Sequence, residues 1–230
     1  MKKDKIKILI PTLNEEKNIE SVITELNNEG YYNITILDSH SSDKTVEIAL
    51  KYNCKILLDP PEKNGFGNSL INGFSNLNSE YFCIFDGDNS FNPKAIEVMI
   101  SKIQEGYDFV FASRYKNKEI SEDDDIFSKF GNYFFTKLVS FLFKIDTTDV
   151  LFLYVVGKKK VIQNLELDQR DYSICTELII KAYKNFKCYE ILSKERKRLY
   201  GNSRVNKVMA SFTLINNIIK LYFRFKWKKK

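Results

Sequence analysis

Short apolar runs alternate along the chain with longer stretches in which apolar residues recur every three or four positions. Apolar runs of this length, rich in Ile, Val and aromatic residues, predict buried strands. They lie at 6–10, 34–37, 54–58, 81–85, 107–112, 150–156 and 190–192. Between them, spacings such as Ile19, Val22, Ile23 and Leu26 place apolar side chains on one face of a helix. This alternation predicts an α/β protein with a mostly parallel central sheet and helices on both faces.

The first helix has a predicted start. Asn14 is the predicted N-cap, because Asn side chains accept hydrogen bonds from the free amides of a first helical turn. Glu15 and Glu16 would then lie in that turn, where acidic residues complement the helix dipole.

Two later segments are strongly apolar but helical in their spacing. Residues 127–143 predict an aromatic helix that could belong to the core or face lipid, and a core position is the simpler interpretation. Residues 208–227 predict a last amphipathic helix, and the polar, acidic residues 116–126 predict a loop. We therefore expect one domain at 1–207, followed at 208–230 by a basic amphipathic helix and tail.

Charge is divided unevenly between these parts. Residues 180–230 contain 15 Lys and Arg but 2 Asp and Glu, a net charge of +13, whereas residues 1–179 contain 21 and 28, a net charge of −7. A basic C-terminal end predicts an anionic partner, and nucleic acid, anionic lipid and a phosphorylated substrate all fit.

Composition narrows the class of protein. A chain of 230 residues with 43% hydrophobic residues can bury a sizeable core. Its four cysteines form no CxxC pair, which predicts reduced structural thiols rather than a zinc site. We see neither a signal-peptide pattern nor an apolar run of about 18 residues, so we expect a cytoplasmic protein.

Two acids follow the apolar run YFCIF directly. If the strand stays extended past Phe85, Asp86 and Asp88 point to the same side at its carboxyl end. Paired carboxylates suit a hard divalent cation, which often also holds a diphosphate. Asp38 and Arg114 also end predicted strands, and ligands of parallel sheets bind at that edge. The alternative is a polar surface turn.

Six short motifs follow one another in a fixed order. They are Pro11-Thr12-Leu13-Asn14-Glu15, 38–45 (DSHSSDKT), Gly65-Phe66-Gly67 with Gly73, Asp86-Gly87-Asp88, Ser113-Arg114-Tyr115 and 198–203 (RLYGNS). With these motifs the chain resembles the family 2 glycosyltransferases, which have the nucleotide-sugar-binding GT-A fold. It is most similar to their polyprenyl-phosphate mannosyl- and glucosyltransferase branch, over nearly the whole chain. The second motif departs from the family's D-D-G-S, with Ser39 and His40 in the second and third positions.

The resemblance implies a role for each matching residue. Asp86 and Asp88 would bind Mg²⁺ or Mn²⁺. The donor nucleotide sugar would contact Pro11, Leu13, Glu15, Asp38, Gly65, Gly67, Asp86, Gly87 and Asp88. Acceptor or phosphate oxygens would contact Arg114, Asn132, Arg198 and Ser203, and the catalytic residues would be Asp88, Glu177 and Arg114.

Each role has a structural alternative. Asp38 could instead form a side-chain-capped turn, and Glu15 could serve the helix dipole. Arg198 could be a solvated member of a basic run. Glu177 could be a general base, but an acceptor phosphate is already anionic and needs none. His40 is expected to be a turn residue rather than a catalyst.

The favoured hypothesis is an inverting, metal-dependent glycosyltransferase that uses a UDP- or GDP-sugar. Its acceptor would be a polyprenyl phosphate, reached by a C-terminus that lies on an anionic membrane surface. The alternatives are a sugar-phosphate nucleotidyltransferase and a non-enzymatic module whose basic tail binds nucleic acid or membrane. An acidic cleft repels nucleic acid, so we do not expect that partner.

Overall fold

The computed structural model describes residues 3–62, 65–116, 126–201 and 207–227. Within them, seven strands form one sheet in the order β3-β2-β1-β4-β6-β5-β7. They are β1 (Ile6–Thr12), β2 (Ile34–Asp38), β3 (Lys55–Leu58), β4 (Tyr81–Ile84), β5 (Phe109–Ser113), β6 (Val155–Lys158) and β7 (Cys188–Leu192). Only β6 runs antiparallel to its two neighbours, β4 and β5. The predicted mostly parallel sheet is therefore confirmed.

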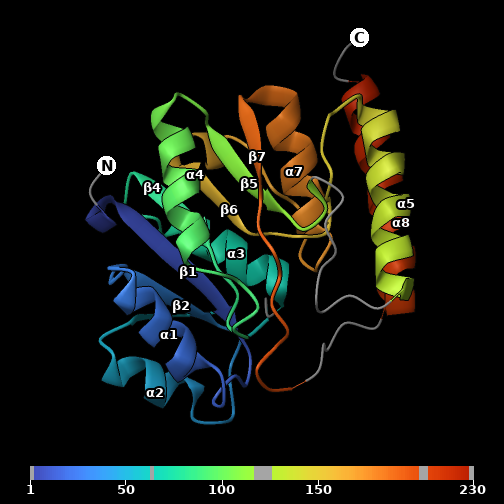
Figure 1. Ribbon diagram of the computed structural model, residues 1–230. Coiled ribbons are helices and arrows are strands. Elements are labelled where there is room, and N and C mark those ends of the chain that lie inside the picture. The colour runs from blue at the N-terminus through green and yellow to red at the C-terminus, as the bar shows by residue number, and fades with distance from the viewer. Residues whose placement is uncertain (1–2, 63–64, 117–125, 202–206, 228–230) are drawn as a thin grey trace.

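Helices cover both faces of this sheet (Figure 1). They are α1 (Ile19–Asn28), α2 (Thr45–Lys51), α3 (Phe66–Ser75), α4 (Lys94–Gln104), α5 (Ile126–Phe143), α6 (Lys159–Ile162), α7 (Ile174–Asn185) and α8 (Lys207–Trp227), after a 3-10 turn at Lys3–Lys5. The first face carries α1, α2 and α4, and the second carries α3, α5, α6, α7 and α8.

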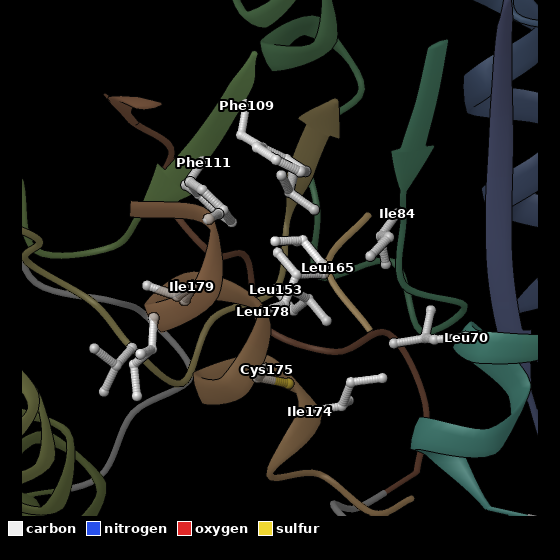
Figure 2. Packing of buried hydrophobic residues seen from close by; sticks show 14 of the residues in the cluster. Leu70, Ile84, Phe109, Phe111, Leu153, Leu165, Ile174, Cys175, Leu178 and Ile179 are labelled. Atoms are coloured by element: carbon white, nitrogen blue, oxygen red, sulfur yellow. The ribbon is translucent and has the colours of Figure 1, made fainter. Parts of the chain in front are cut away.

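Alternate residues of each strand supply the two cores. In β4, Phe82 and Ile84 point to the second face, whereas Cys83 points to the first. In β5, Phe109 and Phe111 likewise belong to the second face. Figure 2 shows these side chains of the second face packed against α3 and α7. This two-sided burial explains why the strand sequences read as continuous apolar runs.

One strand prediction was wrong in its position. The apolar run 150–156 was expected to be a strand, but β6 begins only at Val155. The preceding residues are buried by aromatic packing instead, since Phe152 and Tyr154 contact Phe91 with ring centroids 4.9 Å and 4.5 Å away. An apolar run reports burial, and burial does not require strand pairing.

The predicted helix start at Asn14 was also wrong. Helix α1 begins at Ile19, and Asn14 has a φ of 52°, in the left-handed region. Its side-chain Oδ1 accepts a hydrogen bond from the amide of Ser42 at 2.7 Å, 28 residues away. Asn14 therefore joins two loops instead of capping its own helix.

The last helix packs on the body of the protein. Helix α8 contacts α5 and α7, and Leu214, Ile218 and Leu221 are part of the core of the second face. No helix in the described residues is both long and apolar enough to cross a membrane. The predicted loop at 116–126 and Ser203 lie largely or wholly outside the described residues. The four cysteines are free, as predicted.

Candidate active site

The carboxyl ends of β1, β2 and β4 meet at one edge of the sheet, where most of the predicted site residues lie. Thr12 and Asp38 are register partners at the ends of β1 and β2. Strand β4 pairs with the other side of β1, and the amide of Phe85 continues that pairing to the carbonyl of Leu9 at 3.0 Å. The Asp86-Gly87-Asp88 turn therefore emerges beside the end of β1.

The two acids are close together, although β4 ends at Ile84 and does not extend through them. The charge of Asp88 acts on Asp86 and, after burial, is the second cause that raises the pKa of Asp86 well above its ordinary value. Asp86 is half-buried, so part of its surface is accessible to solvent and protein atoms surround the rest. Such a pair favours a bound cation, because a cation removes the cost of two buried carboxylates.

Asp88 supplies a second reason to expect a cation. Its side chain is 3% exposed, and Oδ1 accepts a hydrogen bond from the amide of Ser90 at 2.9 Å. Oδ2 lies 3.1 Å from Nε of Arg198, but this buried oxygen has no hydrogen bond of good geometry to the described residues. A buried carboxylate oxygen in this condition fits a metal ligand. In the described part of the chain, no cluster of three or more His, Cys, Asp or Glu forms a metal site. A cation here would need ligands from a bound molecule.

The loop after β2 is held by Asp38. This residue is 1% exposed, and its carboxylate accepts hydrogen bonds from the hydroxyl of Thr12 (3.0 Å) and from the hydroxyl and amide of Ser41 (2.6 and 2.8 Å). The arrangement is the side-chain-capped turn considered as the alternative, and it fixes residues 39–41 beside β1. His40 is exposed with a φ of 61°, as expected of a turn residue.

The loop after β1 is accessible. Leu13 is 40% exposed, and Pro11, the last residue but one of β1, is half-buried at the same edge. Glu15 lies near enough to Asp86 for its charge to help raise the pKa of that acid. One of its oxygens accepts a hydrogen bond from Asn18 at 2.7 Å. Glu15 therefore adds to the negative charge of the edge and also holds the entry to α1.

Gly67 is required by close packing. A Cβ at this position would lie 2.5 Å from the backbone carbon of Arg170, and the carbonyl of Arg170 accepts a hydrogen bond from the amide of Gly67 at 3.1 Å. Gly65, with a φ of 118°, makes the turn before it. The first amides of α3 are thus bonded to the loop at 166–171. Gly87 is not constrained in this way, since a Cβ there would meet the end of β1 at ordinary contact distances of 3.4–3.5 Å.

Glu177 lies inside the protein with both oxygens bonded. It is 0% exposed, and it accepts hydrogen bonds from the amides of Asp168 (3.0 and 3.1 Å) and Gln169 (2.8 Å). Lys181 forms an ion pair with it at 2.8 Å. This geometry favours a role for Glu177 in holding the 166–171 loop over a role as a general base.

Arg114 is also held by protein groups. Its Nε and Nη2 bond to the two oxygens of Asp149 at 2.8 and 3.1 Å, and Nη1 bonds to Glu195 at 3.2 Å. The guanidinium lies over the ring of Phe152, 4.9 Å from its centroid. Arg114 thus ties the end of β5 to the loop at 146–153 and to the segment that carries Arg198.

That segment, residues 193–200, runs from the end of β5 past the turn after β4 to Asn18 before α1, and it is named here the crossing segment. Its amides bond in succession to Ser113 O (3.0 Å), Ser90 O (2.9 Å), Asp88 O (3.4 Å) and Asn18 Oδ1 (3.1 Å). Arg196 also forms an ion pair with Glu25 at 2.8 Å. The crossing segment places Arg198 against the two acids, so these predicted residues are brought together.

Several residues of this edge escaped the sequence analysis. Asp59 is 2% exposed and accepts hydrogen bonds from Ser39 (2.7 Å) and Ser69 (2.5 Å), which connects the loops after β2 and β3. Asp149 and Glu195 hold Arg114. Asp149 stands just before an apolar run, a position that could have marked it as an anchoring acid. Glu195 sits in a basic run and gave no such signal.

The predicted acceptor residue Asn132 lies on the inner side of α5. It is 2% exposed, and its Oδ1 has no hydrogen bond to the described residues. Its role as a phosphate ligand stays a prediction, as do the roles of the other site residues.

Comparison with known structures concerns the fold. The fold matches glucosyl-3-phosphoglycerate synthase from Mycobacterium tuberculosis with a TM-score of 0.76, 17% sequence identity, and coverage of 94% of this chain and 79% of that one. That structure contains Mn²⁺, UDP-glucose and phosphoglyceric acid. Another structure of the same enzyme contains Mg²⁺ and UDP. The likeness confirms the predicted GT-A fold.

Several proteins are similar to this chain in sequence. An uncharacterised protein of Methanocaldococcus jannaschii is 32% identical, with 94% of this chain and 92% of that protein aligned. The dolichol-phosphate mannosyltransferase of Pyrococcus furiosus is 28% identical, but this chain spans only 64% of its length. The UDP-N-acetylglucosamine–dolichyl-phosphate N-acetylglucosaminyltransferase of Methanococcus voltae is 28% identical, and 95% of it is aligned.

A family comparison covers the loops after β1, β2 and β4 and their acids, but it ends before Glu177 and the crossing segment. Residues 7–165 match the family described as glycosyl transferase family 2, which includes β1 to β6 and the Asp86-Gly87-Asp88 turn. On the basis of this match, and with the sheet, the loops and the paired acids described above, the chain belongs to glycosyl transferase family 2.

Proposed function

We propose that this family 2 glycosyltransferase transfers a sugar from a UDP- or GDP-sugar to a polyprenyl phosphate, with inversion at the sugar's anomeric carbon. The observation that carries the proposal is the Asp86–Asp88 pair, with its buried, incompletely bonded Oδ2, at the edge where the loops after β1, β2 and β4 meet. Family membership favours glycosyl transfer over nucleotidyl transfer and over a non-enzymatic module.

The donor's diphosphate would lie between the two acids and Arg198. Asp86 and Asp88 would hold Mg²⁺ or Mn²⁺, which neutralises the negative charge that develops on the departing nucleoside diphosphate. Arg198 is 29% exposed beside Asp88, so its guanidinium can turn from the acid to a phosphate oxygen. The accessible loop of Pro11, Leu13 and Glu15 would line the nucleotide, and Asp38 would act indirectly, by fixing the next loop.

An anionic acceptor suits this site better than a neutral alcohol. An alcohol needs a general base, and the candidate base Glu177 is buried and bonded to two amides and to Lys181. A phosphate monoester is already ionised and can attack without losing a proton to the enzyme. Two of the relatives named above act, by their names, on dolichyl phosphate, which supports a lipid-linked phosphate in particular.

The first test is thermal stability against UDP-, GDP- and dTDP-sugars, with and without Mn²⁺. A ligand that binds only the folded protein raises the melting temperature, so one nucleotide class should raise it in a metal-dependent way. Asp88→Ala should abolish that shift. Asp4→Ala, an exposed acid before β1, is the matched control and should leave the shift unchanged. A folded protein that responds to no donor would contradict the proposal.

The second test concerns the acceptor. Sugar transfer from the donor identified above would be measured to a polyprenyl phosphate and to the corresponding polyprenol. We expect transfer only to the phosphate, lowered by about 100-fold or more in Asp88→Ala. Equal transfer to the alcohol would contradict an acceptor that attacks as an anion and would return Glu177 or another group to the role of base.

A further inference from the structure

The outward sides of α5 and α8 are unusually apolar. Ten of the eighteen exposed large hydrophobic side chains in the described residues belong to these two helices. They are Phe130, Tyr133, Phe134 and Phe141 of α5, and Val208, Met209, Phe212, Ile219, Phe223 and Trp227 of α8. Phe141 and Trp227 are 82% and 77% exposed.

These exposed residues are separate from the faces that build the core. In α8, Leu214, Ile218 and Leu221 are buried, whereas Phe212 and Phe223 lie on the opposite side of the helix. The same division holds in α5, whose inner side belongs to the core of the second face. Both helices are therefore apolar on two sides, and the fold requires only the inner one.

The two outward sides lie next to each other. Helices α5 and α8 stand side by side and run in the same direction (Figure 1). The ring of Phe143, at the end of α5, contacts the rings of Tyr222 and Phe225, near the end of α8, at 6.1 and 5.9 Å between centroids. Because both inner sides pack toward the sheet, both outer sides point away from it.

The charge of this surface has a single sign. The 18 residues of α5 and the 21 residues of α8 include no Asp or Glu. Exposed cations are interleaved with the rings, among them Lys137, Lys220 and Lys226, and Lys137 lies 5.6 Å from the centroid of Tyr133. By contrast, the exposed positions of α1 and α4 include the acids Glu20 and Glu97.

We infer that the outward sides of α5 and α8 together form a docking surface for an anionic lipid membrane, named here the docking face. Aromatic and aliphatic side chains enter the boundary between headgroups and acyl chains, and interleaved lysines meet lipid phosphates. A second copy of this chain is a poorer fit, because a symmetric contact would bring the two cationic faces together. The docking face joins the outward side of α5 to α8, whereas the predicted membrane-associated segment was 208–230.

The docking face also adjoins the active site. The hydroxyl of Thr136, on the inner side of α5, accepts a hydrogen bond from the amide of Val150 at 3.3 Å, and the next residue back is Asp149, which holds Arg114. Helix α8 is joined through Arg224 to Asp168, in the loop that contacts α3. The face does not depend on the acceptor proposed above, since its exposed side chains would be the same with a soluble acceptor.

The chain contains a native probe for this inference. Trp227 is its single tryptophan and lies at the end of α8. The full-length protein would be mixed with vesicles of phosphatidylcholine, with or without phosphatidylglycerol, and followed by tryptophan emission and by co-sedimentation. We expect a blue shift and sedimentation with the anionic vesicles, both weakened by salt.

Double variants test the contributions of α5 and α8 to vesicle binding separately. Phe212→Ser with Phe223→Ser in α8, and Phe130→Ser with Phe141→Ser in α5, should each lower partitioning into anionic vesicles by about tenfold or more. Tyr32→Ser with Leu50→Ser, at exposed hydrophobic residues away from the docking face, is the matched control and should leave partitioning unchanged. All six side chains are exposed, so melting temperatures should stay close to that of the parent protein.

Three results would overturn the inference. If the double variant in α5 partitioned into anionic vesicles as strongly as the parent protein, the membrane contact would be restricted to α8. Equal binding to neutral vesicles would remove the role of anionic lipid. The third result would be a parent protein that is a dimer in solution and does not bind vesicles, together with a double variant in α5 or α8 that is a monomer. The face would then be an interface between copies of this chain. None of these results bears on donor binding, so the proposed function would stand or fall separately.

Discussion

Two groups of polar residues at the sheet edge differ in how they are bonded. The Asp86-Gly87-Asp88 turn keeps a buried carboxylate oxygen, Oδ2 of Asp88, without a hydrogen bond to the described residues. Arg114 and Glu177 are also buried, but Arg114 is bonded to two acids, and Glu177 is bonded to two amides and a lysine. The first group has bonding capacity left for a ligand, whereas the second uses its capacity to hold loops together. We therefore expect unused hydrogen-bonding capacity to distinguish ligand-binding residues from positioning residues better than a match to a sequence motif does.

The largest effect should come from the most enclosed member of the second group. Glu177→Ala leaves Lys181 and the amides of Asp168 and Gln169 without their buried partner, and we expect a loss of about 3 kcal/mol in the free energy of unfolding. Urea denaturation would measure it. Glu177→Gln is the sharper comparison for catalysis, because it keeps an acceptor oxygen. A normal unfolding free energy combined with a large loss of kcat would show that Glu177 is a base after all.

A smaller effect should follow at Arg114. Lysine keeps the charge but cannot bond to both oxygens of Asp149 and to Glu195 at once, so Arg114→Lys should lower the free energy of unfolding by about 2 kcal/mol. It should also raise the KM for the donor, because the crossing segment loses an anchor. Arg170→Lys, at an exposed arginine, is the control. If Arg114 instead binds substrate, kcat/KM would fall while the unfolding curve stays unchanged.

The smallest effect should come from the ion pair of Asp168 with Arg224. The hydrogen bond from Arg224 lowers the pKa of Asp168, so the pair stabilises the fold above the ordinary aspartate pKa of about 4 and loses its effect as the pH falls through the lowered value. Both side chains are about half exposed, so Asp168→Asn should cost only about 0.5 kcal/mol at neutral pH. Unfolding curves at neutral and acidic pH would compare the two proteins. A difference that grows in acid would contradict this assignment.

The sheet and most helices could be predicted because their signal is local. Apolar spacing identified α1, α4 and α8 within a few residues of their observed ends. It failed for 150–154, since the aromatic packing of Phe152 and Tyr154 on Phe91 buries these residues although β6 begins only at Val155. It failed at Asn14 because that side chain bonds to a loop 28 residues away.

The edge location of the site was predictable for the same reason, since four of the six motifs lie at the carboxyl ends of β1, β2, β4 and β5. The partners of the charged residues were not. Arg114 is bonded to Asp149 and Glu195, which lie 35 and 81 residues further along the chain. No spacing rule connects such positions. The sequence could therefore mark Arg114 and Glu177 as candidate site residues without showing that each is already hydrogen-bonded to other protein groups.

The crossing segment also fixes when the enzyme can be completed during synthesis. Asn18 exchanges two hydrogen bonds with Tyr200, 182 residues away, and Glu25 meets Arg196 across 171 residues. Strands β1 to β4 can pair with one another on a nascent chain as soon as they leave the ribosome, whereas β5 must wait for β6. The edge of the sheet stays uncovered until residue 200 has emerged. Contacts of such long range form late in folding. A chain released before that point would carry Asp86 and Asp88 yet lack the segment that places Arg198 beside them.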